Sequence, residues 1–293
     1  MDLARTRILN ERFDTVAEHL DSDKSPAVRV AGVYAMAGLA DDWPEHRQMC
    51  VEVLCAYLRM PYEPEPGDDA PVEKRLAFQA GREVRHTVIR VIAAHLNGTA
   101  PLSWCGLNFD FAGAVFDGGD FSGAKFSGGT VSFAGAEFSG EGVNFFLAKF
   151  SGALVDFAGA EVSGGTVGFG YAKFSGGTVN FTGAKFSGAA VSFAGAEFTG
   201  ESPQLTGADA SGDLVFFHAT VFSGGTVSFS RAEFSSQTVD FVGAGFSGGT
   251  VDFARVASWT QPPDFGSGFD MSHPPAGVML PTAPSPSPDS PVP

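Results

Sequence analysis

The chain has 293 residues and a formal net charge of −15, with 38 glycines and 29 phenylalanines against only 18 lysines and arginines. This balance argues against nucleic-acid binding, because phosphate contacts need clustered basic side chains. No apolar run reaches the length of about 18 residues that a membrane-spanning helix needs, and we recognise no signal peptide. We therefore expect a cytoplasmic protein without a membrane span.

Composition divides the chain into three parts. Residues 1–100 contain few glycines, residues 103–270 hold nearly all the phenylalanines, and residues 271–293 are rich in proline, serine and threonine. We expect an α-helical domain, a β domain and a disordered or polyproline-like tail, in that order. For the tail, a bare solvated segment is favoured over a ligand for a small proline-recognition domain.

Four helices are expected in the first part, because apolar residues recur there at spacings of three and four. Their predicted ranges are 9–20, 28–39, 44–58 and 73–96. Acidic residues at 21–23 and 41–42 are interpreted as the caps of the second and third helices. We predict that this domain caps the N-terminal end of the β domain, where unpaired backbone groups would otherwise favour aggregation.

A twelve-residue unit, roughly Ser-Gly-Gly-Thr-Val-x-Phe-x-Gly-Ala-x-Phe, is repeated eleven times from residue 127 to residue 258. A short fixed period is typical of a solenoid, in which each unit is buried only by its neighbours. Glycine costs about 1 kcal/mol at each site in a helix interior, and glycine pairs occur throughout these repeats. The repeats therefore predict a β-solenoid.

Phenylalanines in the repeats follow at alternating steps of five and seven, as at Phe126, Phe133 and Phe138, with Ala or Val two residues before each. A separation of two places both side chains on the same side of an extended segment. One repeat is too short to enclose two phenylalanine rings, so we expect two repeats, or 24 residues, per four-sided coil. The segment from Phe111 to Phe126 has steps of five only, which predicts a smaller first coil of about twenty residues.

This register predicts columns of stacked side chains inside the coil. The first column is Phe126, Phe150, Phe174, Phe198, Phe222 and Phe246. The second is Phe145, Phe169, Phe193, Phe217, Phe241 and Phe265. The third is Phe138, Val162, Phe186, Ala210, Phe234 and Ser258. Burying a phenylalanine is worth roughly 1.5–3 kcal/mol, so these columns should supply most of the stability, and the layer at 199–210, where smaller residues intervene, should be the weakest.

Residues 107–126, LNFDFAGAVFDGGDFSGAKF, resemble the pentapeptide-repeat family, whose unit has a small residue, a polar residue, Leu or Phe, and two turn residues. The resemblance spans about 107–265 and implies a mainly β fold, a right-handed quadrilateral β-helix. Half of the steps depart from the family pattern, because they are seven residues long and carry Val instead of Ala. Part of residues 1–100 also resembles the helical region that precedes such repeats in many actinobacterial proteins, often with transmembrane helices further upstream.

No residue pattern of a catalytic, metal or cofactor site is found. Cys50, Cys55 and Cys105 lack metal-ligand spacing and are expected to be reduced, partly buried thiols. The six histidines are scattered, and the glycines of the repeats serve turns instead of a phosphate-binding loop. The sequence therefore predicts a non-enzyme without a cofactor.

Charged residues beside the phenylalanine columns form two predicted ladders on the outside of the coil. One flank carries Lys125, Lys149 and Lys173, followed by Glu197. The other carries Glu137, Glu161, Lys185, Asp209 and Glu233. We take Lys125, Lys149, Lys173, Glu137, Glu161 and Glu233 as the candidate interaction surface. The simplest alternative is a solvated repeat surface with no partner.

Two functions remain open. The first is a structural or scaffolding module that binds an unidentified protein partner, with a homodimer through the uncapped C-terminal end after Phe265 as one option. The second is a DNA mimic, for which the family resemblance implies DNA gyrase as the partner. Residues 101–270 carry a net charge of −10, and a DNA duplex as long as the predicted solenoid would carry roughly twice that charge. We therefore favour the first function; a contact made by the helical domain, with the coil as a spacer, is a third alternative.

Overall fold

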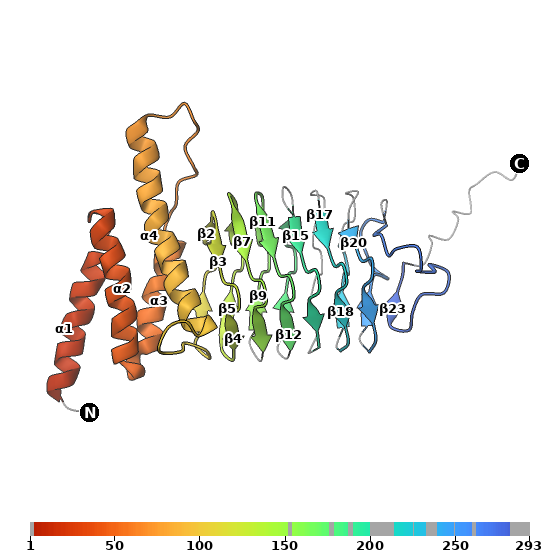
Figure 1. The fold of residues 1–293 in the computed structure, drawn as a ribbon, viewed down its shortest axis with the longest axis horizontal. Coiled ribbons are helices and arrows are strands. Elements are labelled where there is room, and N and C mark those ends of the chain that lie inside the picture. Colours follow the sequence, from red (N-terminus) through yellow and green to blue (C-terminus); the bar gives the residue numbers. More distant parts are fainter. Residues whose placement is uncertain are drawn as a thin grey trace, which may run out of the picture.

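The computed structural model describes residues 3–151, 154–175, 179–186, 190–199, 214–224, 226–232, 239–248, 250–259 and 262–281. In this part of the chain, α-helices are followed by a parallel β-solenoid, as expected (Figure 1). The helices lie at one end of the solenoid, and the last described residues lie at the other end.

The predicted helices are confirmed. They are α1 (Leu3–His19), α2 (Pro26–Asp42), α3 (Arg47–Arg59) and α4 (Val72–Asn97), with a 3-10 turn, η1 (Pro44–His46), before α3. Helix α1 begins six residues before its predicted start. The apolar residues of its first turns, Leu3 and Ile8, are exposed and do not belong to the buried face of the helix. The apolar spacing that predicts a buried face therefore starts only at Leu9.

The predicted helix caps are wrong. Helix α2 is capped by Ser25, whose Oγ accepts a hydrogen bond from the Val28 amide at 3.5 Å, and not by residues 21–23. Asp41 and Asp42 are the last residues of α2 and do not cap α3. The Asp41 carboxylate instead accepts a hydrogen bond from the Trp104 indole at 2.9 Å. A tertiary contact between residues 63 positions apart therefore takes the side chain that local capping would use.

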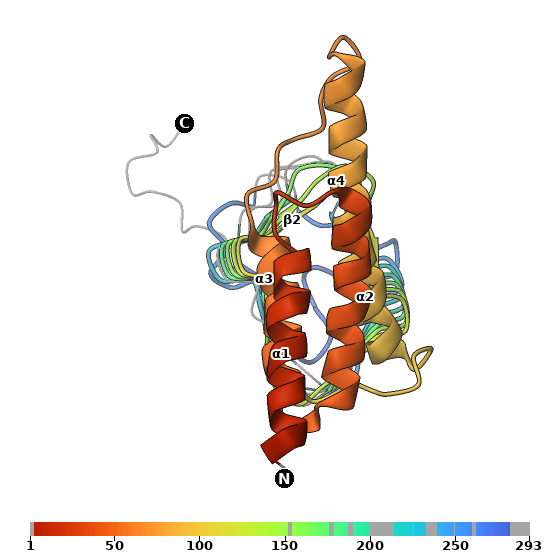
Figure 2. The same cartoon turned by 90° about the vertical axis from the view of Figure 1, so that its left-hand side faces the viewer.

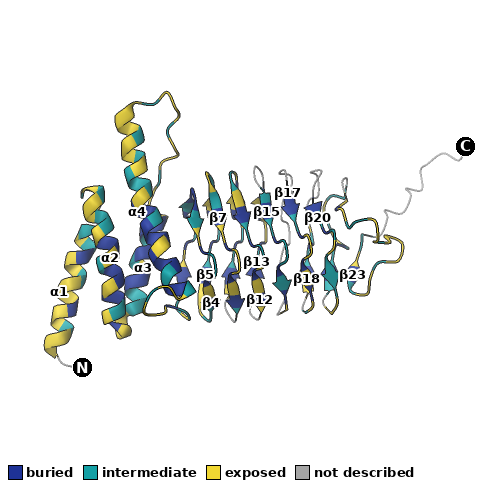
Figure 3. Cartoon of the chain, viewed as in Figure 1, coloured by how far each residue is buried: buried dark blue, intermediate teal, exposed yellow. Residues whose placement is uncertain are grey.

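The helices pack in layers onto the first turn of the solenoid. Helix α1 contacts α2, α2 contacts α3 and α4, and α3 and α4 contact the first strands. Figure 2 looks onto this end, with α1 and α2 side by side in front of the solenoid. Figure 3 shows the buried sides of the helices and strands and the largely exposed α1.

Short parallel strands stack into four columns that form the solenoid. The first stack contains β1 (Phe109–Asp110), β5 (Thr130–Ser132), β9 (Leu154–Asp156), β13 (Val179–Asn180), β19 (Thr226–Ser228), β22 (Thr250–Asp252) and β23 (Val278–Met279). The second contains β2 (Val115–Phe116), β6 (Glu137–Phe138), β10 (Glu161–Val162) and β14 (Lys185–Phe186).

The third and fourth stacks complete each turn. The third contains β3 (Gly119–Asp120), β7 (Gly142–Asn144), β11 (Thr166–Gly168), β15 (Ala190–Ser192), β17 (Leu214–Phe216) and β20 (Val239–Asp240). The fourth contains β4 (Lys125–Ser127), β8 (Lys149–Ser151), β12 (Lys173–Ser175), β16 (Glu197–Phe198), β18 (Val221–Phe222) and β21 (Gly245–Phe246). Glycine-rich turns separate strands of two or three residues, which is why neither a helix nor a long strand forms.

The predicted 24-residue turn is confirmed by the strand register, in which Lys149 pairs with Lys173, 24 residues on. The predicted first coil of twenty residues is wrong. Phe109 pairs with Val131 and Phe116 pairs with Phe138, both 22 residues on. This turn contains three steps of five and then one step of seven, from Phe126 to Phe133, and the step of seven makes it longer than the steps of five alone predict.

The predicted inner columns are confirmed where the structure describes them. Neighbouring rings from Phe126 to Phe246 lie 5.1, 4.9, 4.6, 5.4 and 5.5 Å apart between centroids. Those from Phe145 to Phe265 lie 5.0, 4.9, 5.0, 4.6 and 5.2 Å apart. In the third column Val162 pairs with Phe138 and Phe186. Its members Ala210 and Phe234, and most of the layer predicted to be weakest, lie outside the described residues.

The end of the described chain folds back onto the solenoid. Strand β23 pairs with β22, with Val278 opposite Val251, and the Val278 side chain is buried. The prediction of a disordered or polyproline-like tail from residue 271 is therefore wrong where β23 forms, and the end of the first stack is covered. A single short apolar segment decides this, whereas the prediction rested on the proline and serine content of the whole tail.

Candidate interaction surface

Many outward carboxylates of the solenoid hold its turns. The residue just before a buried phenylalanine accepts a hydrogen bond from the amide two residues further on, as Asp156 does from Ala158 at 2.9 Å. The same bond is made before buried phenylalanines by Asp110, Asp120, Asp240 and Asp252, and before the partly buried Phe265 by Asp264. Asp270, which precedes Met271, accepts the equivalent bond from the Ser272 amide. Asn144 and Ser132 accept the same bond at 3.0 Å and 3.4 Å. Part of the acidic charge thus follows from turn chemistry.

The lysine ladder, Lys125, Lys149 and Lys173, is assembled as predicted. These residues are neighbours on β4, β8 and β12, and all three are exposed. Lys173 binds Glu197 on the next strand, with Nζ 2.8 Å from Oε2. Within the described residues no ion pair is found for Lys125 or Lys149. Two ammonium groups without an ion pair among the described residues therefore lie on neighbouring strands of the fourth stack.

The acidic ladder lies on a different stack from the lysine ladder. Glu137 and Glu161 are exposed neighbours on β6 and β10, and Lys185 follows them on β14. Glu233 lies outside the described residues. The structure thus brings the two glutamates together but separates them from Lys125, Lys149 and Lys173, so the candidate residues belong to two distinct surfaces.

A third surface was not predicted: an exposed apolar cluster at the turn between the third and fourth stacks, which we call the corner patch. It consists of Phe146, Leu147 and Tyr171, whose exposed fractions are 41%, 50% and 58%. The Phe146 and Tyr171 rings meet edge to face, with centroids 5.7 Å apart. The three side chains come from two adjacent coils and form one contact surface.

Two members of the corner patch adopt a backbone conformation that favours glycine. Leu147 has φ 58° and Tyr171 has φ 54°. At the equivalent turn position of other described coils, Gly123, Gly195 and Gly243 have φ 68°, 67° and 72°, and Ala219 has φ 51°. Interlayer hydrogen bonds fix this conformation, since the amides of Leu147 and Tyr171 donate to carbonyls of the next coil at 2.9 Å. A side chain in the left-handed region costs about 1–2 kcal/mol.

The aromatic rings of the corner patch lie over glycines of the next coil. A Cβ added to Gly195 would approach the Tyr171 ring to 2.7 Å, and one added to Gly170 would approach the Phe146 ring to 3.3 Å. The sequence does contain the signal for this patch. An alignment of the repeats shows Phe-Leu at 146–147 where the coil before has Ser-Gly.

The junction between the helices and the solenoid centres on Asp117. Its carboxylate accepts hydrogen bonds from Tyr62 Oη at 2.7 Å and Arg82 Nε at 3.0 Å, and it lies 2.9 Å from His86 Nε2. Burial alone would raise the pKa of Asp117, but the hydrogen bonds from His86 and Tyr62 and the nearby charges of His86 and Arg82 hold that pKa below its usual value. We interpret this cluster as a joint, because each of these groups binds another part of the chain.

Backbone groups of the first solenoid turn are satisfied by helix side chains. The Gln48 amide donates to the Asn108 carbonyl at 3.0 Å and accepts from the Asn108 amide at 2.9 Å, as a neighbouring strand would. Buried Arg85 donates to the Val115 carbonyl at 2.7 Å. The helices therefore cover an edge that would otherwise be open to pairing.

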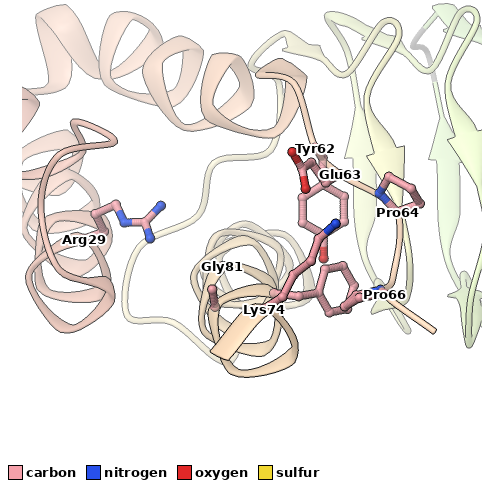
Figure 4. Close-up of a pocket in the computed structure, with 9 residues that line it drawn as sticks. Arg29, Tyr62, Glu63, Pro64, Pro66, Lys74 and Gly81 are labelled. Carbon is pink, nitrogen blue, oxygen red and sulfur yellow. The ribbon is translucent and has the colours of Figure 1, made fainter. Parts of the chain in front are cut away.

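A shallow groove in the helical part has a volume of about 270 Å³ (Figure 4). Its lining residues are Arg29, Tyr62, Glu63, Pro64, Pro66, Lys74, Ala77, Phe78 and Gly81. Tyr62 and Phe78 stack with ring centroids 5.5 Å apart, and Arg29 lies across the groove from them. Arg29 Nη1 already donates to Tyr57 Oη at 3.0 Å. The groove mixes both charges with aromatic rings, so it favours no single class of ligand.

The thiols of Cys50 and Cys55 have no feature of a reactive site. Cys50 and Cys55 are buried and form no disulfide, and burial raises their pKa to about 11 and about 12. In the part of the chain that the structure describes, no three His, Cys, Asp or Glu side chains are arranged to hold a metal ion. Nor does any described helix combine the length and hydrophobicity that a membrane span requires.

Comparison with known proteins returns no family model, no curated protein and no solved structure that matches this chain.

Proposed function

We propose that this chain is a non-catalytic, cytoplasmic protein-interaction module of the pentapeptide-repeat type, with a right-handed, four-sided coil that presents the corner patch to a protein partner. The observation that carries this proposal is the exposure of Phe146, Leu147 and Tyr171 together on one corner. Clusters of exposed aromatic and aliphatic side chains are typical of interaction sites.

The opposite corner, which is the turn between the first and second stacks, supports this interpretation, because there the same turn is built without large apolar side chains. It carries Ala-Gly at 134–135 and 158–159, and Gly135 and Gly159 have φ 62° and 63°. Both corners close the coil equally well. Folding therefore does not require the corner patch, and a partner gives a physical reason for retaining it.

The proposal is tested by capture of partners from a lysate of the source organism with the full-length chain as bait. The key variant combines Phe146→Ser, Leu147→Gly and Tyr171→Gly, which places at 146–147 the Ser-Gly of residues 122–123 and glycine at 171. Thr182→Ala, on the opposite corner, is the matched control. We expect a defined set of proteins to bind the wild type and the control but not the triple variant. Equal capture by all three would contradict the proposal.

A second candidate is the DNA mimic, which the net charge of −10 over residues 101–270 and the Glu137–Glu161 ladder favour. The lysine ladder opposes it, because a mimic needs a continuous negative stripe. The test is supercoiling by purified DNA gyrase with and without the protein. Inhibition that disappears in the Glu137→Lys, Glu161→Lys double variant would favour the mimic, and unchanged supercoiling would exclude it.

A further inference from the structure

We propose that the corner patch and the lysine ladder together bind an extended acidic segment of a partner protein, in which carboxylates alternate with apolar side chains. This inference rests on the proposed function and names the chemistry of the partner. It starts from the proximity of two features in the sequence. Leu147 and Tyr171 each precede a ladder lysine, Lys149 and Lys173, by two residues.

Geometry places the apolar and basic groups side by side. Ala148 and Ala172, between each pair, are buried, so the residues on either side of them are left at the surface. The lysines stack in register from β4 to β12, and the ring contact between Phe146 and Tyr171 also crosses from one coil to the next. The surface is therefore a stripe along the solenoid axis, with ammonium groups on one side and apolar groups on the other.

Both halves of this stripe carry a cost in the folded protein. Like charges that face each other across neighbouring strands are destabilising, and Lys125 and Lys149 have no compensating ion pair in the described part of the chain. The left-handed Leu147 and Tyr171 carry the cost of their backbone conformation. The repulsion between the lysines and the backbone strain of Leu147 and Tyr171 therefore occur on the same corner, and folding requires neither of them. A partner that neutralises the lysines and covers the rings would offset both.

The spacing of the stripe fits an extended chain. Neighbouring strands lie about 4.8 Å apart, and side chains on one face of an extended segment recur about every 6.6 Å. Lysine side chains are long enough to make up the difference between these two spacings. Acidic residues two positions apart in the segment can therefore reach lysines on successive coils. Side chains on the other face of the segment, or at its edges, then lie over the aromatic rings.

Charge favours an acidic protein segment over a nucleic acid. The stripe has three lysines, and Glu197 already neutralises Lys173, whereas the chain as a whole carries −15. A nucleic acid, which carries a charge on every phosphate, would be repelled by this field more strongly than a peptide with a few carboxylates. A peptide with a few carboxylates and apolar side chains is attracted by the nearby lysines. It also buries the Phe146 and Tyr171 rings against its apolar side chains.

The test is fluorescence anisotropy with the full-length protein and labelled ten-residue peptides. One set alternates Asp or Glu with Leu or Phe in several orders; the controls replace the acidic residues with Lys, or the apolar residues with Ser. We expect the peptides that contain both acidic and apolar residues to bind the protein. A higher salt concentration should lower their affinity. Lys125→Glu with Lys149→Glu should weaken binding at least about tenfold, and Lys185→Glu on the second stack should not.

Several outcomes would overturn the proposal. The proposal fails if no peptide with both acidic and apolar residues binds, or if the lysine-containing control peptides bind equally tightly. It also fails if Lys125→Glu with Lys149→Glu leaves the affinity unchanged. Tighter binding of a single-stranded oligonucleotide than of any peptide would assign the stripe to nucleic acid instead. Circular dichroism and the melting temperature of each variant report on folding, which exposed-residue changes should leave intact.

The same variants separate this inference from the proposed function. If partner capture is lost in the corner-patch variant but persists after Lys125→Glu with Lys149→Glu, the interaction function stands and the acidic partner is wrong. If capture is unaffected by the corner-patch variant, the proposed function itself fails.

Discussion

At the scale of single residues, the turn position of each repeat shows how backbone and side chain compete. The layers fix a left-handed conformation there through hydrogen bonds, and glycine accepts it without strain. Leu147 and Tyr171 accept it at a cost, as do Ala219 and Arg231. A repeat can therefore tolerate a side chain at this position, but folding gains nothing from it.

Leu147→Gly should raise the free energy of unfolding by about 1 kcal/mol, because it relieves the left-handed strain of an exposed side chain. Gly135→Leu at the opposite corner is the matched reverse change, since a Cβ there would meet no atom within 4 Å. It should lower the free energy by about 1–2 kcal/mol. Urea denaturation measures both. A loss of stability in Leu147→Gly would show that the side chain contributes to folding.

Phe174→Ala should lower the free energy of unfolding by about 3–5 kcal/mol, because this ring is buried and stacked between Phe150 and Phe198. Lys173→Ala, one residue away, should cost less than about 1 kcal/mol, since the exposed pair with Glu197 is worth little. Thermal and urea denaturation give both values. Equal stability of the two variants would overturn the assignment of the inner and outer positions.

At the scale of elements, the joint between α4 and the first turn depends on polar side chains at a buried edge. Gln48, Arg82 and Arg85 bind backbone groups of the first turn that no preceding coil can reach. Unsatisfied backbone groups at a buried edge are costly, so this joint should be the most sensitive part of the helical cap.

Asp117→Asn should lower the free energy of unfolding by about 1–3 kcal/mol at neutral pH, because the amide NH₂ replaces an acceptor that faces three donors. The folded-state pKa of Asp117 is lowered, so its stabilising contribution is complete well above the ordinary value of about 3.9 and is lost as the pH falls through the folded-state pKa.

Melting temperatures measured between pH 7 and pH 3 test this assignment. The difference between the wild type and Asp117→Asn should shrink as the pH falls below about 4. A difference that stays constant over this range would show that the carboxylate charge does not act at the joint.

At the scale of the whole molecule, the two ends of the solenoid are closed by different means. Helices α3 and α4 cover the first turn, whereas β23 adds a last strand to the first stack. Phe265 and Phe269 stack with centroids 4.3 Å apart near the same end. Dimerisation through the C-terminal end stays a prediction, and any such contact would have to form around β23.

Removal of β23 should expose the edge of β22 and promote self-association. A chain that ends at residue 281 keeps β23, and we expect it to melt and elute as the full chain does. A chain that ends at residue 274 loses the pairing of Val251 with Val278, so it should melt at a lower temperature and form dimers or larger species. Light scattering after gel filtration measures this, and identical behaviour of the two chains would contradict it.

The sequence by itself determined the solenoid, its 24-residue register and the phenylalanine columns. The reason is that a β-solenoid is a one-dimensional repeat, in which each residue is buried by its counterpart one turn away. The lysine ladder followed from the same register. The first turn departs from its predicted length because its fourth step, from Phe126 to Phe133, already has the seven-residue length of the repeats.

Only the tertiary structure decided the features that depend on contacts between distant residues. Asp41 binds Trp104 instead of capping a helix, and Val278 returns to pair with Val251. Neither contact follows from periodicity, because each joins residues that the repeat does not relate. The register places positions 147 and 171 on adjacent coils, but the edge-to-face contact of the Phe146 and Tyr171 rings depends on side-chain orientation in the folded protein. The repeat thus specifies the scaffold, and the departures from it define the surface that we assign to a partner.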